Sequence, residues 1–511
     1  MKDKKFYITT PIYYTNGVPH IGHAYSSLVA DVIARYKRID GFDVKFSTGV
    51  DENSQKALLK AQDLGMNIVD YLDMMATKHQ AVWDGLNISY TDFIRTTEPR
   101  HHKFVQEVIQ KTFEAGFIKK GNYEGLYCIG CESFKKVEDL NTDGLCPDHL
   151  TKPEIIKEEN YFFELSKFQE KLEKFYEENP NFTIPNNRFN EMKTFLKEGL
   201  EDFSISRNKK LFGIPFPIDK EQVTYVWYDA LFNYLTVCKY PVKSGLSISP
   251  DLDMDFWPAD LHVVGKEIAR FHVIYWPAML EAAGYEKPKN VLVTGFITVD
   301  GQKIGKSLGN AIDPVEFSAK YSRDLMLLYL LTAFPIGNDG DFSEEQAVFM
   351  YNAKLANNLG NLLNRFLVLS LKIGGKIQGK IDDKISYNIS QLTSGYDSIR
   401  MNSYDLKQTL DKVFLFGDIL NKYLDDTKPW NLKDESQLEE LINILYTLGE
   451  GLRIMAICLY PFFYDKMGEL LNRIGLNYGD LEKCDLNFNE LFNKTETFTI
   501  KEKGEALYPR I

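Results

Sequence analysis

The stretch Pro19-His20-Ile21-Gly22-His23 follows a run of β-branched and aromatic residues, Phe6 to Thr10, and opens a segment of regularly spaced apolar residues. The run predicts a strand. A proline in the first turn of a helix sacrifices no hydrogen bond, and apolar residues recur at three- and four-residue steps from Ile21, so a helix is expected directly after the strand. A strand that leads straight into a helix is the opening unit of an α/β fold with a parallel sheet.

The two histidines of this stretch lie three residues apart, so His20 and His23 are expected on one face of the first helical turn. Free backbone N–H groups and the positive end of the helix dipole favour an anion there. Imidazole N–H groups could donate hydrogen bonds to a phosphate whose negative charge grows during a reaction. The alternative is a pair of capping or surface histidines.

Further strand and helix signals indicate a doubly wound parallel sheet. Val44 to Gly49 alternates like a strand and is followed by Asp51 and a helix beginning near Asn53. The stretches 260–265 and 290–295 are apolar runs closed by glycine, typical of buried parallel strands. Because ligands bind beyond the carboxyl ends of such strands, Asp51 could pair with a substrate ammonium group. Its alternative role is a helix N-cap.

Composition limits the classes of function. The chain has 511 residues, six cysteines and a formal net charge of -12, which argues against indiscriminate nucleic-acid binding. No apolar stretch approaches the ~18 residues of a membrane span, and the first strand begins too early to leave room for a signal peptide. A reducing compartment suits this cysteine usage.

A polar, loop-rich segment carries two short ligand pairs, Cys128/Cys131 and Cys146/His149. The C-x2-C and C-x2-H spacings could supply the four ligands of a closed, structural Zn²⁺ site. The segment 117–224 is therefore expected to be an insertion that splits the α/β domain. Within it, residues 157–199 are expected to form two helical pieces.

A second basic motif lies far along the chain, in the glycine-rich loop 301–310. Lys303 and Lys306 are three residues apart in this loop, which could close over a triphosphate and neutralise a leaving pyrophosphate. The alternative is an exposed basic loop.

The remaining candidate residues lie on expected helices. Trp227, Ala230 and Tyr234 could share a face that lines a pocket, and Ile268 and His272 are four residues apart. After Asp341 the pattern is helical, and Asn361 and Arg365 could read a base with Trp430 nearby. An ordinary core and a solvated face are the alternatives. The expected segments are 1–116 and 225–342 for the two halves of the α/β domain, 117–224 for the insertion and 343–511 for a helical domain.

As a set these motifs resemble the class I aminoacyl-tRNA synthetases, and the methionyl-tRNA synthetase family most closely. Pro19 to His23 matches the family's HIGH motif, and Lys303-Ile304-Gly305-Lys306-Ser307 matches its KMSKS motif. Gly49-Val50-Asp51-Glu52, Gly265 to Ile268 and Lys428-Pro429-Trp430 add to the similarity, which spans nearly the whole chain. One departure is Gly305, where the family has serine; glycine removes a hydroxyl and loosens the loop backbone.

The resemblance implies ATP-dependent activation of L-methionine and its transfer to tRNA(Met), the initiator included. It implies a structural Zn²⁺ on the four ligands above, Mg²⁺ with ATP, a cytoplasmic location with no membrane partner, and a monomer. It also implies roles by position. The methionine pocket would comprise Ile12, Tyr14, Asp51, Trp227, Ala230, Tyr234, Ile268 and His272. ATP would be bound by His20, Gly22, His23, Lys303, Lys306 and Ser307, with the two histidines and two lysines catalytic. The anticodon would be contacted by Asn361, Arg365 and Trp430.

Other interpretations stay open at this point. One is a class I synthetase for leucine, isoleucine, valine or cysteine, although the insertion is short for an editing domain. Another is a small-molecule nucleotidyltransferase of the same superfamily, and a third is a non-catalytic RNA-binding relative.

Overall fold

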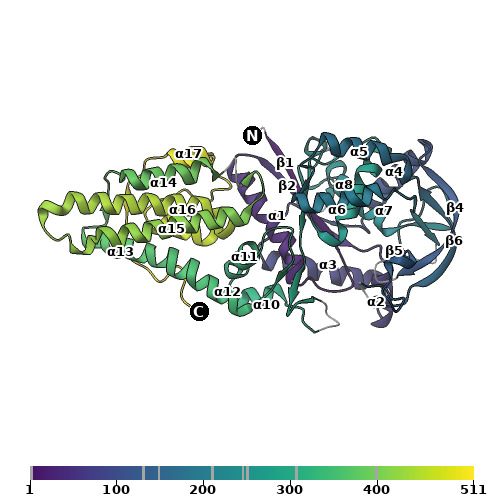
Figure 1. Cartoon of the computed structure of the whole chain (residues 1–511), viewed down its shortest axis with the longest axis horizontal. Helices are drawn as coiled ribbons and strands as arrows, with labels where there is room; N and C mark the ends of the chain where they lie inside the picture. The colour runs from purple at the N-terminus through teal and green to yellow at the C-terminus, as the bar shows by residue number, and fades with distance from the viewer. Residues whose placement is uncertain are drawn as a thin grey trace. The chain divides into compact units, whose positions relative to one another are not determined.

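The computed structural model describes residues 4–128, 133–147, 150–208, 212–243, 247–248, 253–304, 309–396 and 401–511. The chain divides into two compact units (Figure 1). The sheet unit comprises Lys5–Ser27 and Lys45–Gly295, and the helical unit comprises Met1–Lys4, Leu28–Val44 and Phe296–Ile511. The division into four segments expected from the sequence stays a prediction.

A six-stranded sheet of order β3-β2-β1-β13-β14-β7 forms the centre of the sheet unit. Its registers are parallel between β1 and β13, β13 and β14, β14 and β7, and β2 and β3, as the doubly wound prediction requires. Continuous apolar strands are expected where helices cover both faces of a sheet. The strands are β1 (Lys5–Tyr14), β2 (Asp43–Asp51), β3 (Asp92–Arg95), β7 (Thr183–Ile184), β13 (Leu261–Gly265) and β14 (Asn290–Thr294).

Helices connect these strands, and the first of them confirms the helix expected after Pro19. The helices are α1 (Ile21–Ile39), α2 (Gln55–Asp63), α3 (Ile68–Gly85), α4 (Pro99–Glu114), α7 (Val226–Leu231), α8 (Asn233–Lys239) and α9 (Trp276–Ala283). The N-cap of α2 is Ser54, whose side chain accepts a hydrogen bond from the Ala57 N–H group. Asp51 is therefore not the cap of this helix.

The segment expected to be an insertion carries its own antiparallel sheet. Its strands are β4 (Ile118–Cys128), β5 (Ser133–Lys135), β6 (Glu154–Phe163) and β8 (Phe203–Ser204), and β4 and β6 pair along nearly their whole length (Figure 1). The helical prediction for 157–199 is wrong at its start, because residues 157–163 belong to β6. Residues 157–163 show no strand alternation, and they form a strand because they pair with β4. The two helices follow as α5 (Gln169–Glu178) and α6 (Asn186–Lys197).

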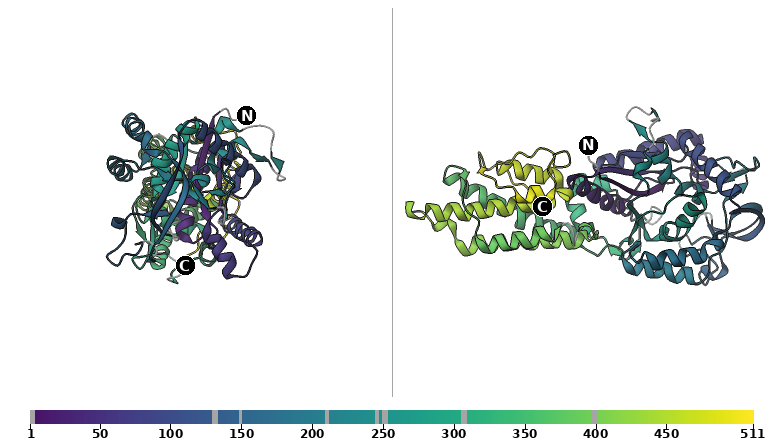
Figure 2. Two further views of the ribbon diagram at one scale, coloured as in Figure 1. Left: turned by 90° about the vertical axis from the view of Figure 1, so that its right-hand side faces the viewer. Right: turned by 90° about the horizontal axis from the view of Figure 1, so that it is seen from above.

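The helical unit begins with a small sheet of β15 (Ile297–Val299), β16 (Gln302–Lys303) and β17 (Gly340–Asp341). It continues through α10 (Pro314–Lys320), α11 (Arg323–Thr332), α12 (Glu344–Tyr351), a π-helical segment Asn352–Gly360 and α13 (Asn361–Lys372). The last helices are α14 (Asp383–Ser394), α15 (Leu406–Thr427), α16 (Leu438–Arg473) and α17 (Phe488–Asn493). Helices α13, α15 and α16 lie side by side (Figures 1 and 2).

The long α16 is apolar enough in composition to cross a membrane. In the structure, however, the best 18-residue window within Glu435–Arg473 is 89% buried. It is a core helix, kinked where Pro461 interrupts the hydrogen bonds and Phe463 leaves helical geometry (φ -127°, ψ 46°).

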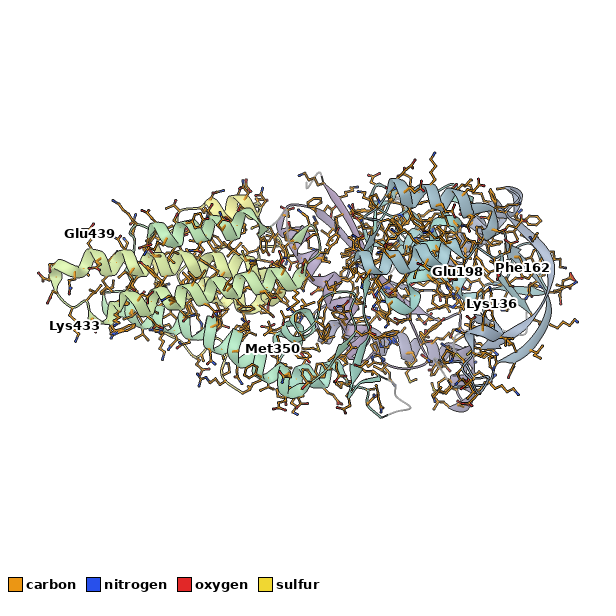
Figure 3. All side chains as sticks on the ribbon, viewed as in Figure 1. Lys136, Phe162, Glu198, Met350, Lys433 and Glu439 are labelled. Carbon is orange, nitrogen blue, oxygen red and sulfur yellow. The ribbon has the colours of Figure 1, made fainter. Side chains whose placement is uncertain are left out.

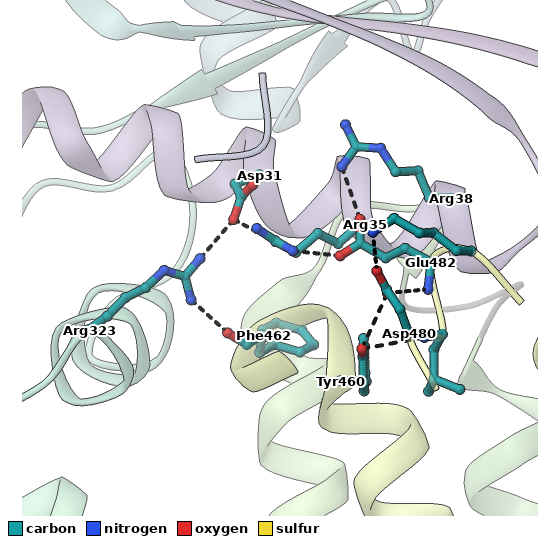
Figure 4. Close-up of polar contacts among 10 residues, drawn as sticks. Asp31, Arg35, Arg38, Arg323, Tyr460, Phe462, Asp480 and Glu482 are labelled. Carbon is teal, nitrogen blue, oxygen red and sulfur yellow. Dashed lines mark hydrogen bonds and ion pairs between the residues drawn. The ribbon is translucent and has the colours of Figure 1, made fainter. Parts of the chain in front are cut away.

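Buried ion pairs connect four segments of the helical unit (Figure 4). Asp31 of α1 is fully buried and accepts hydrogen bonds from Arg35 at 3.0 Å and Arg323 at 2.7 Å. Arg323 also donates to the Phe462 carbonyl at the kink of α16, 3.0 Å away. Arg35 also forms an ion pair with Glu482, and Glu482 forms a second ion pair with Arg38. Each buried charge thus has an opposite charge beside it.

Candidate active site

The two histidines of the Pro19–His23 stretch lie against each other at the start of α1. Their ring centroids are 3.9 Å apart, and the His20 carbonyl accepts the first helical hydrogen bond, from the Ala24 N–H group. His20 Nδ1 accepts a hydrogen bond from the Gly22 N–H group, and His23 Nδ1 accepts one from the His20 N–H group, each at 3.1 Å. A neutral imidazole that accepts at Nδ1 carries its proton at Nε2. Both rings therefore present an Nε2–H donor.

Gly22 is part of this arrangement because of its size. A Cβ atom at this position would lie 3.0 Å from His20 Cε1 and 3.1 Å from His20 Nδ1. Glycine therefore lets the His20 ring lie close over the backbone of the first turn.

Tyr13 supports the second histidine from β1. Its ring meets that of His23 edge-on at 5.4 Å, and its hydroxyl lies 2.9 Å from Ser27 Oγ. Burial raises the pKa of Tyr13 to about 12, so the phenol stays protonated and able to donate.

Asp51 is the last residue of β2 and is buried, with 4% of its surface exposed. The residues after it are fixed by the turn that follows β3: the Glu52 N–H group donates to Thr96 Oγ1 at 2.9 Å, and Asn53 Nδ2 donates to the Thr96 carbonyl at 3.0 Å. Asp51 thus occupies the carboxyl edge of the parallel sheet, where the fold predicts a ligand.

Aromatic rings gather around Trp227 on α7. The ring of Phe271 stacks on it with the centroids 3.8 Å apart and the planes within 2° of parallel, and Tyr14 meets it edge-on at 6.2 Å. Trp227 Nε1 is buried, and no described residue accepts a hydrogen bond from it. Sequence reasoning did not select Phe271, although it is adjacent to His272 and three residues after Ile268, both of which were selected.

Tyr234 and His272 form a buried hydrogen-bonded pair. His272 Nδ1 lies 3.0 Å from the Ile268 carbonyl, so this nitrogen carries the proton and Nε2 accepts from the Tyr234 hydroxyl, 2.7 Å away. Burial lowers the pKa of His272 to about 4, which keeps the ring neutral. Ile268 and His272 thus lie on the same face, as their spacing predicts. The backbone that carries them is not a regular α-helix, because Ile268 ends a 3₁₀ turn (Lys266–Ile268) and His272 lies in a π-helical turn (Phe271–Tyr275).

A second buried histidine, not selected from the sequence, lies beside Tyr234. The ring centroids of His262 and Tyr234 are 4.4 Å apart. His262 Nε2 accepts from Trp276 Nε1 at 3.2 Å, so Nδ1 donates to Thr9 Oγ1 at 2.7 Å. Burial lowers the pKa of His262 well below its usual value. A single histidine inside an apolar strand indicates only that the strand is buried, so nothing in the sequence was a reason to select His262.

The other two residues of the expected methionine pocket lie close to this cluster. Ile12 packs against the apolar group around Tyr7, whose hydroxyl donates to the Tyr234 carbonyl at 2.9 Å. Ala230 is buried on α7, three residues after Trp227, and its carbonyl accepts from Asn233 Nδ2 at 2.6 Å.

The lysine loop is only partly described. Lys303 ends the short strand β16, and Ile304 is buried at 7% exposure. Gly305, Lys306 and Ser307 lie outside the described residues.

In the helical unit, the structure brings Arg365 and Trp430 together. The guanidinium of Arg365 lies 5.2 Å from the Trp430 ring centroid and pairs with Asp425 at 2.7 Å, while Trp430 is 39% exposed. Asn361 is exposed at the start of α13. Figure 3 shows Lys433 and Glu439 at one end of the bundle, and the turn that carries Trp430 leads to them from α15.

Two of the four expected zinc ligands are described. Cys128 and Cys146 are both buried, and Thr151 contacts both: its Oγ1 lies 4.0 Å from Cys128 Sγ, and its carbonyl accepts from the Cys146 N–H group at 2.9 Å. Among the described residues no group of three or more possible metal ligands is seen, so the zinc site stays a prediction. Cys131 and His149 lie outside the described residues.

Comparison with known proteins agrees with this geometry. Residues 6–152 and 149–367 match the family described as tRNA synthetases class I (M). The methionine–tRNA ligases of Thermotoga maritima and Bacillus subtilis are 43% and 40% identical to this chain over 99% and 100% of its length, covering 80% and 78% of their own. A structure of Mycobacterium tuberculosis methionyl-tRNA synthetase with methionyl-adenylate is 34% identical, with a TM-score of 0.92 over 99% of this chain and 100% of that one. These findings do not favour the other synthetases or the nucleotidyltransferases. The chain belongs to the methionyl-tRNA synthetase family of class I aminoacyl-tRNA synthetases.

Proposed function

We propose that this chain activates L-methionine with ATP and transfers the methionyl group to tRNA(Met), the initiator tRNA included. In the first step the methionine carboxylate attacks the α-phosphorus of ATP, which enters as its Mg²⁺ complex, and pyrophosphate leaves. In the second step the 3′-terminal adenosine of the tRNA attacks the carbonyl of the adenylate, and AMP leaves. The pair of Nε2–H donors at the start of α1 is the observation that supports this chemistry most directly.

The proposed role of His20 and His23 is to stabilise charge on the reacting phosphate. Donors that are already oriented before the reaction are effective because they need no reorganisation when charge develops. The backbone hydrogen bonds to both Nδ1 atoms fix that orientation. Lys303 and Lys306, with Ser307, would hold the leaving pyrophosphate.

The proposed amino-acid site holds the ammonium group at Asp51 and the thioether among the aromatic rings. Sulfur makes favourable contacts with aromatic edges and faces, which suits Tyr14, Trp227 and Tyr234. Because the Tyr234 hydroxyl donates to neutral His272, neither ring brings a net charge to the apolar wall. Ile12, Ala230 and Ile268 would complete that wall.

Amino-acid-dependent exchange of pyrophosphate into ATP, measured with each of the twenty amino acids, tests the function. Exchange with methionine alone is expected. Exchange with leucine, isoleucine, valine or cysteine in its place would contradict the proposal, and aminoacylation of tRNA(Met) completes the test.

We also propose one structural Zn²⁺ on Cys128, Cys131, Cys146 and His149. The metal would cross-link a segment that has few apolar residues of its own. About one zinc per chain is expected from metal analysis of purified protein, and C128S and C146S should each lose it. Full metal content in both variants would contradict the site. A monomer and a cytoplasmic location stay predictions.

A further inference from the structure

The expected methionine pocket is assembled from two separate segments. Asp51, at the end of β2, would hold the ammonium group, whereas Trp227 and Ala230 on α7 would contact the side chain. The separation between these segments determines which length of amino acid reaches both ends. Any residue that fixes this separation is therefore important for selectivity.

Asn53 makes a direct connection between the two segments. Its Nδ2 atom donates to the Thr96 carbonyl at 3.0 Å and to Asp229 Oδ2 at 3.2 Å. Asp229 lies on α7 between Trp227 and Ala230 and is fully buried, and Asn53 is 4% exposed. A hydrogen bond to a carboxylate is stronger than one between neutral groups, and burial strengthens it further.

Glu52 makes the same turn rigid from the other side. Its carboxylate is fully buried, accepts from Arg95 Nε at 2.9 Å and accepts from the Thr97 hydroxyl. Arg95 also pairs with Asp73 of α3 at 2.7 Å. The residues directly after Asp51 are thus bound to the turn after β3 and, through Asn53, to α7.

We propose that Asn53 and Asp229 are positioning residues that set the length of amino acid the enzyme accepts, by holding α7 at a fixed distance from Asp51. This inference rests on the proposed function. It concerns a hydrogen bond outside the residues expected to touch methionine. Loss of the bond lets α7 move relative to the end of β2, so longer and shorter homologues gain relative to methionine.

The test compares kcat/KM in pyrophosphate exchange for methionine, ethionine and S-methylcysteine, which differ by one methylene each. One methylene in an apolar pocket contributes a factor of ~10 to 200 in kcat/KM. In N53A we expect the ratio of methionine to ethionine to fall about tenfold. D229N should lower it less, because its amide oxygen can still accept from Asn53. The double variant N53A/D229N should lower the ratio no more than N53A alone, since N53A has already removed the hydrogen bond that D229N weakens.

The helical unit offers a matched control. Asn358 is buried and donates from Nδ2 to the Phe414 carbonyl at 3.1 Å and to Asp418 Oδ1 at 2.5 Å, the same combination of acceptors. N358A should change thermal stability as N53A does but leave the three amino-acid ratios unchanged. If N53A folds poorly, the nearly isosteric variant D229N takes its place in the comparison of the amino-acid ratios.

The outcomes separate the two proposals. Wild-type protein without methionine-dependent exchange would overturn the proposed function. An active wild-type enzyme in which N53A and D229N lower kcat/KM for all three amino acids by the same factor would overturn this inference alone. The inference would also be overturned if the double variant lowered the ratio of kcat/KM for methionine to that for ethionine by the product of the two single effects.

Discussion

The indole of Trp227 and the ring of Phe271 lie parallel, 3.8 Å between centroids and 2° between planes. They come from α7 and from the π-helical turn before α9, so the stack joins two elements of the expected methionine pocket.

Removal of this stack should weaken methionine binding selectively. We expect W227A to raise the KM for methionine about tenfold or more, because a large buried aromatic surface is lost, with little change in the KM for ATP. F271L should have a smaller effect in the same direction. Pyrophosphate exchange at varied methionine and varied ATP measures both constants. Equal rises in the two would exclude Trp227 from the pocket.

The orientation of the two histidines gives a prediction about individual nitrogen atoms. H23A should slow adenylate formation by ~10²-fold or more, the scale for loss of one transition-state donor. H23Q should retain more activity than H23N, because only the glutamine amide nitrogen can reach the place of Nε2. Single-turnover formation of methionyl-adenylate measures the rate. A near-normal rate in H23A would contradict the role.

Substitution of Arg365 or Trp430 should weaken the use of tRNA and leave methionine activation unchanged. We expect W430A and R365A to raise the KM for tRNA(Met) in aminoacylation at least tenfold, since stacking of a base on an aromatic ring contributes ~1–3 kcal/mol. Pyrophosphate exchange without tRNA should stay at the wild-type rate. A comparable fall in exchange would show that these residues act on folding or on the amino-acid site.

Buried neutral histidines should make the sheet unit sensitive to acid. Burial lowers the pKa of His272 to about 4 and that of His101 to about 3, below the value of about 6.5 in an unfolded chain. Between these pKa values the unfolded state binds more protons, so stability is full above pH ~6.5 and falls as the pH decreases, by about 3 kcal/mol for His272. Urea unfolding followed by tryptophan fluorescence from pH 7 to pH 4 measures the loss. H101N, whose amide can keep the contact with Thr236, should show a shallower dependence; an identical slope would contradict the assignment.

The buried ion pairs of the helical unit should be sensitive to loss of one partner. D31N leaves Arg35 and Arg323 facing a neutral group, and we expect it to lower the free energy of unfolding by about 3–5 kcal/mol. D426N removes an exposed partner of Lys422 and should cost ~1 kcal/mol or less. Chemical denaturation of both variants makes the comparison. Equal small losses would show that Asp31 is not stabilised by its partners.

The sequence predicted the fold where local signals agree with tertiary structure. The strand–helix unit at the N-terminus and the buried strands β13 and β14 follow from periodicity and from apolar runs closed by glycine. The helix predicted from residue 157 was wrong because residues 157–163 carry no period-two pattern and are made a strand by pairing with β4. Strand β7, two residues long, has no detectable pattern and is formed only by its pairing with β14.

The residues of the candidate site likewise fall into those that local sequence signals indicate and those that they do not. His20 and His23 could be selected because they are close in sequence and lie at a helix start. Phe271, His262 and Asn53 gave no such signal, because their contacts come from residues distant along the chain. The hydrogen bond between Asn53 and Asp229 spans 176 positions.

The π-helical segment Asn352–Gly360 has a consequence for insertions and deletions. A π turn holds one residue more than an α turn. Deletion of one residue from this segment would therefore convert a π turn into an α turn, and the helix would continue into α13 without a break. A residue removed from α13 itself, which has no wide turn to convert, would rotate the helix residues after it by about 100° about the helix axis, since an α-helix has 3.6 residues per turn. A deletion between Asn361 and Arg365 would therefore turn Arg365 away from Trp430, whereas a deletion within Asn352–Gly360 would keep the two side chains together.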